Sequence, residues 1–110
     1  MLSSYCNQLF SDTYEPTIGS DFFNYTSKFG AGCSAKNVNL QFWDLAGEIS
    51  YVEVRNEFYK DSQLCMIVTD TTSQQSFDGI DMWLREVSKH GGEKMPVVVV
   101  GTKTDLKAKR

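Results

Sequence analysis

The sequence predicts an α/β fold of three layers, in which helices cover both faces of a mainly parallel sheet. Residues 64–68 and 97–100 are unbroken apolar runs with many branched side chains, as in parallel strands that are buried on both faces. Between these runs, apolar residues recur at helical spacing, so strand, helix and strand together predict a βαβ unit. The 110 residues contain no repeat or low-complexity tract and fit one domain.

The first part of the chain predicts a short helix and a hairpin. Residues 2–10 have weak helical character and are followed by a polar turn. Residues 22–29 alternate loosely between apolar and polar side chains, and residues 38–42 alternate cleanly, which predicts two strands. Gly30 and Gly32 turn the chain between them, so the strands should pair antiparallel through a loop longer than two residues.

Five apolar residues at helical spacing predict the helix between the two apolar runs: Phe77, Ile80, Trp83, Leu84 and Val87. Ser73 or Ser76 can cap the start of this helix, and Gly91 and Gly92 end it. His90, the only histidine, lies at the helix end, and we expect it to neighbour the C-terminal cap rather than to catalyse a reaction.

The composition excludes several classes of protein. A chain that is 41% hydrophobic and 23% charged is an ordinary soluble protein. The net charge of −3 provides no basic field for nucleic acid or an acidic membrane. The apolar runs are too short to span a bilayer, and the N-terminus lacks a signal segment, which indicates a cytoplasmic protein. Residues 107–110 contain no cysteine for prenylation, so no membrane anchor is assigned to this chain.

The cysteines indicate neither a disulfide framework nor a zinc site. Cys6, Cys33 and Cys65 are an odd number at wide spacing, and we expect buried, reduced thiols. With a single histidine, a zinc site or a Cys/His hydrolase lacks the side chains that it needs.

Polar residues follow three of the predicted strands. Residues 44–47, 70–72 and 101–105 each come directly after one of them. Because ligands of α/β proteins bind at the carboxyl ends of parallel strands, these segments are expected to meet at one edge of the sheet. From loop chemistry alone, solvated strand ends and a ligand site are equal alternatives.

Three motifs in order now point to a family: YEPTIG at residues 14–19, WDLAG at 43–47 and VVGTKTDL at 99–106. At this spacing they resemble the small GTPases of the Ras superfamily, and Trp43 before the aspartate makes them Rab-like. Residues 53–61 look most similar to the Rbj group, Rab-like G domains that carry a J domain. The resemblance implies a P-loop NTPase-type (Ras-like) sandwich that binds GTP or GDP with Mg²⁺.

The resemblance implies a guanine-recognition loop at residues 102–105. Asp105 would accept hydrogen bonds from the N1–H and the exocyclic amine of guanine. Adenine has no amine at the corresponding position, and its N1 is an acceptor. The buried carboxylate of Asp105 would therefore stay unpaired beside adenine. The stem of Lys103 would lie along the base plane. Thr102 stands where most relatives have asparagine and is expected to brace the loop with fewer hydrogen bonds.

The resemblance also implies two phosphate-sensing loops. The hydroxyl of Thr17 would bind Mg²⁺ and its amide the γ-phosphate. Asp44 would hold Mg²⁺ through water, and the amide of Gly47 would meet the γ-phosphate. Loss of that phosphate would release both loops, which makes a molecular switch. On the residues alone, Asp44 could instead cap the next helix, and Thr17 could be a turn residue after Pro16.

Two departures from the family pattern change the expectation. Glu48 occupies the position of the catalytic glutamine; a carboxylate lacks the amide donor and adds negative charge, so slow GTP hydrolysis is expected. None of the eight glycines lies in a G-x-x-x-x-G-K-[ST] motif, and Met1 aligns just beyond it. The chain, residues 1–110, is therefore expected to be a partial G domain, from the first helix to the guanine loop. Its first strand with the P-loop and its last strand and helix would be missing.

A missing first strand would leave two strand edges of the sheet without partners. In this family the first strand lies between the strands at residues 38–42 and 64–68, so both would keep an unpaired edge. Unsatisfied backbone groups cost free energy comparable with the stability of a small domain, so the isolated chain should fold poorly or aggregate. We also expect no measurable GTP affinity in a fluorescent-nucleotide assay.

Three functions remain open at this point. The first is a partial Rab-like GTP/GDP switch that binds effectors or regulators through the segments from Ile18 to Phe23 and from Ile49 to Tyr59. The second is a nucleotide-free pseudo-GTPase that acts as an interaction module through the same surfaces. The third is a non-functional gene fragment. An in-frame strand and P-loop directly upstream of Met1 would favour the switch, and a stop codon would favour the other two.

Overall fold

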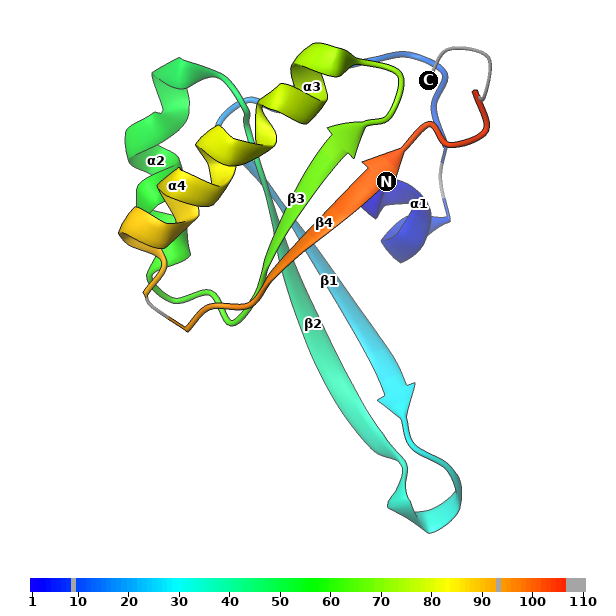
Figure 1. Ribbon diagram of the computed structural model, residues 1–110. Helices are drawn as coiled ribbons and strands as arrows, with labels where there is room; N and C mark the ends of the chain where they lie inside the picture. The colour runs from blue at the N-terminus through cyan, green and yellow to red at the C-terminus, as the bar shows by residue number, and fades with distance from the viewer. Residues whose placement is uncertain (9, 93, 107–110) are drawn as a thin grey trace. The chain divides into compact units, whose positions relative to one another are not determined.

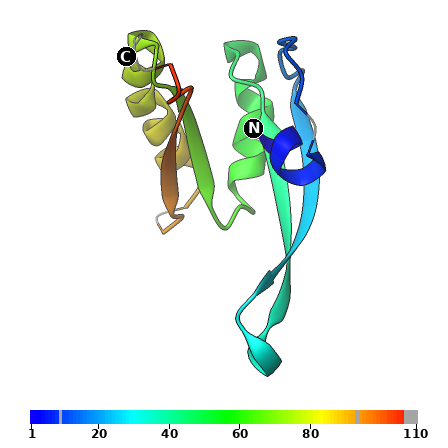
Figure 2. The ribbon, with the colours of Figure 1, turned by 90° about the vertical axis from the view of Figure 1, so that its right-hand side faces the viewer.

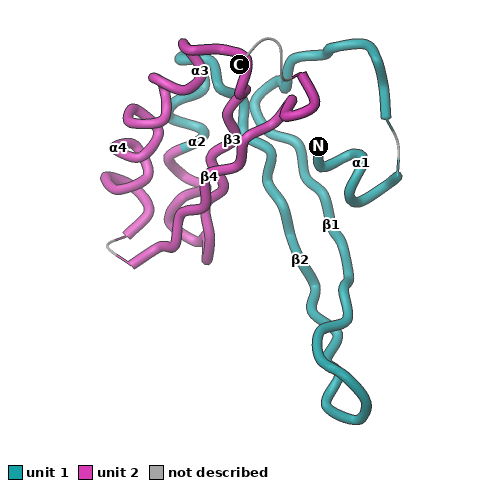
Figure 3. Tube along the Cα trace, turned by 45° about the vertical axis from the view of Figure 1, so that its right-hand side comes forward, with its two compact units in different colours: residues 1–55 teal, residues 56–110 magenta. Residues whose placement is uncertain are grey.

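The computed structural model describes residues 1–8, 10–92 and 94–106. The chain forms two compact units, residues 1–55 and 56–110, which Figure 3 shows in different colours. Residues 107–110, for which no prenylation cysteine was predicted, lie outside the described residues. No helix in the described part of the chain is long and apolar enough to cross a membrane.

A long hairpin dominates the first unit (Figure 1). β1 (Ser20–Phe29) and β2 (Lys36–Leu45) pair antiparallel along their whole length, joined through η1 (Gly32–Ser34). Gly30 has a φ of 95°, and a Cβ there would lie 3.0 Å from the carbonyl oxygen of Ser34, so the turn requires glycine. The predicted hairpin is confirmed, and both strands are longer than predicted.

Helix α1 (Leu2–Asn7) lies against this hairpin (Figure 2). The ring of Tyr5 lies 4.8 Å from the ring of Tyr25 on β1 and 6.0 Å from that of Phe42 on β2. The helix is shorter than predicted because Gln8 adopts a left-handed conformation, with a φ of 55°, and caps the last turn.

The second unit contains the predicted βαβ unit. β3 (Cys65–Asp70) and β4 (Val97–Thr102) pair parallel. Two consecutive helices, α3 (Gln74–Asp78) and α4 (Ile80–His90), connect them. Ser73 caps α3, since its hydroxyl accepts a hydrogen bond from the backbone N–H of Ser76. The predicted strand order and helix start are confirmed; the helix is divided into two pieces.

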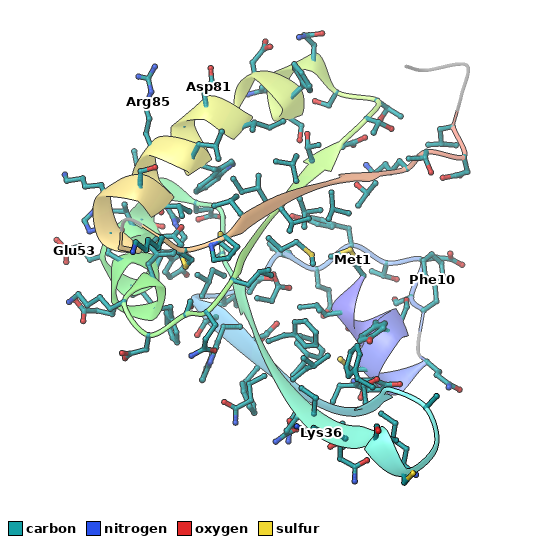
Figure 4. All side chains as sticks on the ribbon, turned by 60° about the horizontal axis from the view of Figure 1, so that its bottom comes forward. Met1, Phe10, Lys36, Glu53, Asp81 and Arg85 are labelled. Carbon is teal, nitrogen blue, oxygen red and sulfur yellow. The ribbon has the colours of Figure 1, made fainter. Side chains whose placement is uncertain are left out.

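Only one side of α4 is buried. Val87 is 3% exposed, whereas Asp81 and Arg85 project from the opposite side (Figure 4). His90 is the last residue of the helix, as predicted. Phe77 on α3 is 63% exposed, so the predicted apolar stripe begins one helical turn too early.

The parallel strand pair is buried on one face within the described residues. Ile67 and Thr69 of β3 are each 6% exposed, whereas Met66 and Val68 on the other face are 41% and 46% exposed. The sequence predicted burial of both faces. Among the described strands, β1 and β2 form one sheet and β3 and β4 another, so β2 and β3 each pair with one neighbour.

The three cysteines are free thiols, as predicted. Cys6 and Cys65 are half-buried, and burial raises the pKa of the Cys65 thiol. Cys33 is exposed in η1, so the prediction that all three are buried is wrong for this residue. The turn at residues 30–35 contains only glycine, alanine, cysteine and serine, and such small side chains offer little surface that could cover the thiol.

The second unit predicts self-association. Unpaired strand edges and half-exposed apolar side chains favour contacts between chains, so the chain should associate at concentrations on the order of 10–100 µM. Light scattering after gel filtration at several concentrations measures this. Val68→Lys, which charges the open face of β3, should reduce association, whereas Gln75→Lys, which adds the same charge on α3, should not. A monomer at every concentration would contradict the prediction.

Candidate functional site

The structure brings Thr17 and Asp44 together in the first unit. β2 extends two residues beyond Trp43, so Asp44 lies within the strand rather than after it. The Thr17 hydroxyl lies near enough to the Asp44 carboxylate to lower its pKa. Glu48, not Asp44, is the N-cap residue of the following η2 (Ile49–Tyr51), and no side chain caps it. The alternative in which Asp44 caps the next helix is therefore wrong.

The charge of Asp44 is only partly compensated. Partial burial raises the pKa of its carboxyl, and the neighbouring Asp21 carboxylate raises it further. The N-terminal ammonium of Met1 and the hydroxyl of Thr17 oppose this rise in pKa without cancelling it. Asp21 is directly opposite Asp44 in the hairpin, and sequence analysis missed it because strand register is set by the turn. Two facing carboxylates produce an excess of negative charge that suits a cation.

Arg55 holds the loop that contains Gly47. It lies in α2 (Val52–Tyr59), is 4% exposed, and its Nη1 donates to the carbonyl oxygens of Ala46 at 2.9 Å and Glu48 at 2.6 Å. The backbone N–H of Ala46 donates to the carbonyl of Gly19 at 2.9 Å. The backbone is therefore held on both sides of Gly47.

Arg55 is not among the predicted site residues, because an arginine in a short helix usually faces solvent. One signal was present: Arg55 lies one helical turn before Tyr59, and both belong to the same helix stripe. Tyr59, 6% exposed, donates from its hydroxyl to Glu86 at 2.9 Å. The spacing of four places Arg55 and Tyr59 on the same side of α2, and both residues are buried.

In the second unit, Thr102 braces the end of β4 against β3. Its hydroxyl donates to the carbonyl of Thr69 at 3.0 Å. Its own carbonyl accepts from the backbone N–H of Thr71 at 3.2 Å and from the Thr71 hydroxyl at 2.8 Å. A threonine at this position therefore makes cross-strand hydrogen bonds of its own.

The predicted guanine loop is a tight turn after β4. Lys103 has a φ of 57°, and its carbonyl accepts the backbone N–H of Leu106 at 3.1 Å. Asp105 lies inside this turn and is exposed, so its carboxylate is open to a ligand. The ammonium of Lys103 lies 2.6 Å from a carboxylate oxygen of Asp70 at the end of β3.

The predicted site residues thus form two groups. Thr17 and Asp44 lie in the first unit with the Gly47 loop, and residues 102–105 lie in the second. Their convergence at one sheet edge stays a prediction. Within the described ranges, no group of three or more His, Cys, Asp or Glu side chains could hold a metal ion. Thr17 would supply one oxygen ligand to Mg²⁺ and Asp44 would hold the ion through water, which fits an ion that commonly keeps several waters.

We predict that Arg55 keeps the Gly47 loop ordered. Arg55→Met removes the donor to two carbonyls, one of them buried, which should cost about 1–3 kcal/mol of loop stability. Hydrogen exchange followed by mass spectrometry should then show faster exchange in residues 46–49. Arg55→Lys keeps the charge without the planar, forked donor set and should be intermediate.

Lys60→Ala is the matched control for the Arg55 variants. Lys60 and Glu57 form an ion pair whose side chains are 58% and 73% exposed, and such pairs contribute about 0–1 kcal/mol. This variant should leave exchange in residues 46–49 unchanged. Equal exchange in Arg55→Met and the parent chain would show that Arg55 does not order the loop.

Comparison with known sequences identifies the family. A sequence model of the Ras family matches residues 1–110. The GTP-binding protein YPT1 of Saccharomyces cerevisiae (strain ATCC 204508 / S288c) is 34% identical over 110 residues, which are all of this chain and 52% of that protein. The chain therefore spans about half the length of this relative. With its α/β units and its three motifs in order, the chain belongs to the Ras family and is a Rab-like small GTPase.

Proposed function

We propose that this chain carries the guanine-recognition loop and both phosphate-sensing loops of a Rab-like switch that alternates between GTP and GDP. The observation that carries the proposal is the turn after β4, which leaves the Asp105 carboxylate exposed beside a fixed Lys103. The meeting of Thr17 and Asp44 supports it independently. A cytoplasmic location and the binding of regulators belong to the same proposal.

Base recognition rests on Asp105. Guanine presents two parallel donors, its N1–H and its exocyclic amine, and a carboxylate accepts both. Each unmatched polar group costs about 1–3 kcal/mol when it is buried by the ligand, so adenine is rejected. The exposed carboxylate has room for a base to pair with it edge-on.

Thr17 and Asp44 would hold Mg²⁺. Hydroxyl and carboxylate oxygens are ligands that this ion prefers. The pKa of Asp44 is raised and the Asp21 carboxylate faces it, so the two carboxylates lack a compensating positive charge that a cation would supply. Bound there, Mg²⁺ would neutralise phosphate oxygens of the nucleotide. Thr17 and Asp44 would orient it.

The Gly47 loop would sense the γ-phosphate, and hydrolysis of GTP to GDP and phosphate beside it would be slow. Arg55 holds the carbonyls of the residues on both sides of Gly47. Because glycine has no side chain, the backbone N–H of Gly47 would be able to approach a phosphate closely. Glu48 carries a carboxylate where an amide would both accept from water and donate to the phosphoryl group. Its negative charge opposes charge that builds on phosphate oxygens, so hydrolysis would be slow.

The effector surface would be apolar. Ile18 is 80% exposed and Ile49 is 88% exposed. The rings of Phe22 and Trp43 lie 4.7 Å apart, and both residues are about half exposed. Exposed aromatic and branched side chains of this kind are typical of protein interfaces. Because none of these contacts needs a nucleotide, they also favour the second candidate, a nucleotide-free interaction module.

Base preference tests the proposal against the interaction module. In Asp105→Asn the carboxamide accepts one hydrogen bond and donates another, which matches the N1–H and the C2 carbonyl of xanthine. A fluorescent-nucleotide assay is expected to detect no binding, but hydrogen exchange at low protein and millimolar nucleotide concentrations reports much weaker binding. It should show residues 101–106 protected by GDP in the parent chain. The variant should prefer xanthosine diphosphate, a change in preference of at least about tenfold.

Asp81→Asn is the control for this exchange experiment because Asp81 lies on the exposed side of α4 and should keep the preference for GDP. Equal protection of the parent chain by GDP, ADP and xanthosine diphosphate would refute guanine recognition. That result would leave the interaction module as the better account of the exposed apolar residues.

The metal-free chain should be more stable without the charge of Asp44. Its folded-state pKa is raised above 3.8, so the folded chain binds the proton more tightly, and stability falls as pH rises through the raised pKa. At pH 7 the ionised Asp44 therefore destabilises the fold. Asp44→Asn should raise Tm by about 1–2 °C at pH 7, discounted for solvent screening, and should have little effect below the ordinary pKa.

Mg²⁺ gives this thermal experiment a second arm. Millimolar Mg²⁺ should raise the Tm of the parent chain more than that of Asp44→Asn, since the variant lacks the charged ligand. Asp12→Asn, an exposed carboxylate in the same unit, is the control and should respond as the parent does. A lower Tm for Asp44→Asn at pH 7 without metal would contradict the sign of the shift.

A further inference from the structure

We propose that Asp70 positions Lys103 for the base, by holding its ammonium at the end of β3 while its aliphatic stem stays free. This inference deepens the guanine recognition proposed above and rests on it. Asp70 Oδ2 lies 2.6 Å from Lys103 Nζ. Asp70 is the last residue of β3 and pairs with Thr102, the last residue of β4, so Lys103 comes directly after the strand partner of Asp70. Asp70 lies outside the three motifs at residues 14–19, 43–47 and 99–106 that carry the family resemblance.

Asp70 is itself fixed. Its second carboxylate oxygen, Oδ1, accepts from the backbone N–H of Thr72 at 2.9 Å and from the Thr72 hydroxyl at 2.7 Å. Its backbone N–H donates to the Ser76 hydroxyl at 3.0 Å, and its carbonyl accepts from the N–H of Ser73 at 3.1 Å. The hydrogen bonds from Lys103 and then Thr72 lower the pKa of Asp70 to about 2, so the carboxylate stays charged under all ordinary conditions.

Lys103 needs such an anchor. Its backbone has a φ of 57°, a left-handed conformation that is unfavourable for a residue with a Cβ. Its side chain is 56% exposed although its ammonium is bound. A free lysine stem samples many rotamers, and a ligand that packs on it must restrict them. With the ammonium tied to Asp70, that restriction exists before the ligand arrives, which raises affinity by preorganisation.

The roles of Asp70 and Asp105 then separate. Asp105 reads the edge of the base and sets the preference among bases. Asp70 touches no base and acts through Lys103, whose stem would pack on the face of any purine. Loss of Asp70 should therefore weaken all purine nucleotides by the same factor and leave the preference for guanine unchanged. A merely structural role in the sheet would not predict this division.

The first test needs no nucleotide. Asp70→Asn keeps a carbonyl oxygen for Thr72 but removes the charge that binds Lys103. Acylation by an N-hydroxysuccinimide ester, followed by mass spectrometry, measures how accessible each lysine amine is. The rate at Lys103 should rise about threefold, as expected for a half-exposed ion pair, and the rate at Lys60 should not change. Thr72→Val, which removes one hydroxyl donor to Asp70, should change the rate much less.

The second test uses GDP and xanthosine diphosphate at millimolar concentration, with hydrogen exchange of residues 101–106 as the readout. Asp70→Asn should bind both about threefold more weakly, with their ratio unchanged. Lys103→Met keeps an apolar stem without the ammonium. The double variant Asp70→Asn/Lys103→Met should bind no more weakly than Lys103→Met alone, because Asp70 acts only through that ammonium.

The outcomes distinguish this inference from the function on which it rests. An unchanged Lys103 acylation rate in Asp70→Asn overturns the positioning, whatever the nucleotides do. A changed ratio between the two nucleotides, or additive losses in the double variant, overturns it as well. If acylation rises as expected but the parent chain shows no preference for GDP, Asp70 still positions Lys103, and guanine recognition is the claim that fails.

Discussion

Strand register is the constraint on which the chemistry of this chain depends. Backbone hydrogen bonds fix β1 against β2 and β3 against β4, and the register decides which polar side chains face each other at the strand ends. It places Asp21 opposite Asp44 and Asp70 opposite Thr102, one residue before Lys103. A slip of one residue would turn each of these side chains to the other face of its sheet. The charges that face one another are therefore a product of main-chain pairing.

Much of the fold follows from local patterns in the sequence. Period-2 alternation, two apolar runs and a serine cap predicted the hairpin, the parallel pair and the start of α3. The strand ends were harder, because Asp44 and Leu45 belong to β2 although the polar residue suggests that the strand has ended. Backbone pairing, including the bond from Ala46 to Gly19, extends a strand past a polar side chain at little cost. Burial of both sheet faces could not be inferred, since a branched residue favours strands whether or not it is covered.

Some residues of the candidate site could be predicted from local sequence motifs, and others depend on tertiary contacts. Thr17, Asp44, Lys103 and Asp105 could be found because they lie in short motifs at family spacing. Asp21, Arg55 and Asp70 could not, since each acts through a partner that register or helix packing brings near. Residues 70–72 were predicted as a polar strand end, yet the role of Asp70 depends on a lysine 33 positions along the chain. A sequence motif identifies groups that touch a ligand more readily than groups that hold them in place.

Two carboxylates near strand ends have opposite electrostatics, and this difference separates their roles. Asp70 has a lysine and two donors from Thr72, so its charge is compensated and its pKa falls to about 2. Asp44 has one hydroxyl donor, a facing carboxylate and partial burial, so its pKa rises. A carboxylate that is already neutralised gains little from a cation, whereas an undercompensated one gains much. By this reasoning Asp70 orients Lys103 and is a poor site for a cation. Asp44 is the better site, because Mg²⁺ would offset the unfavourable free energy of its ionised carboxylate in the metal-free fold.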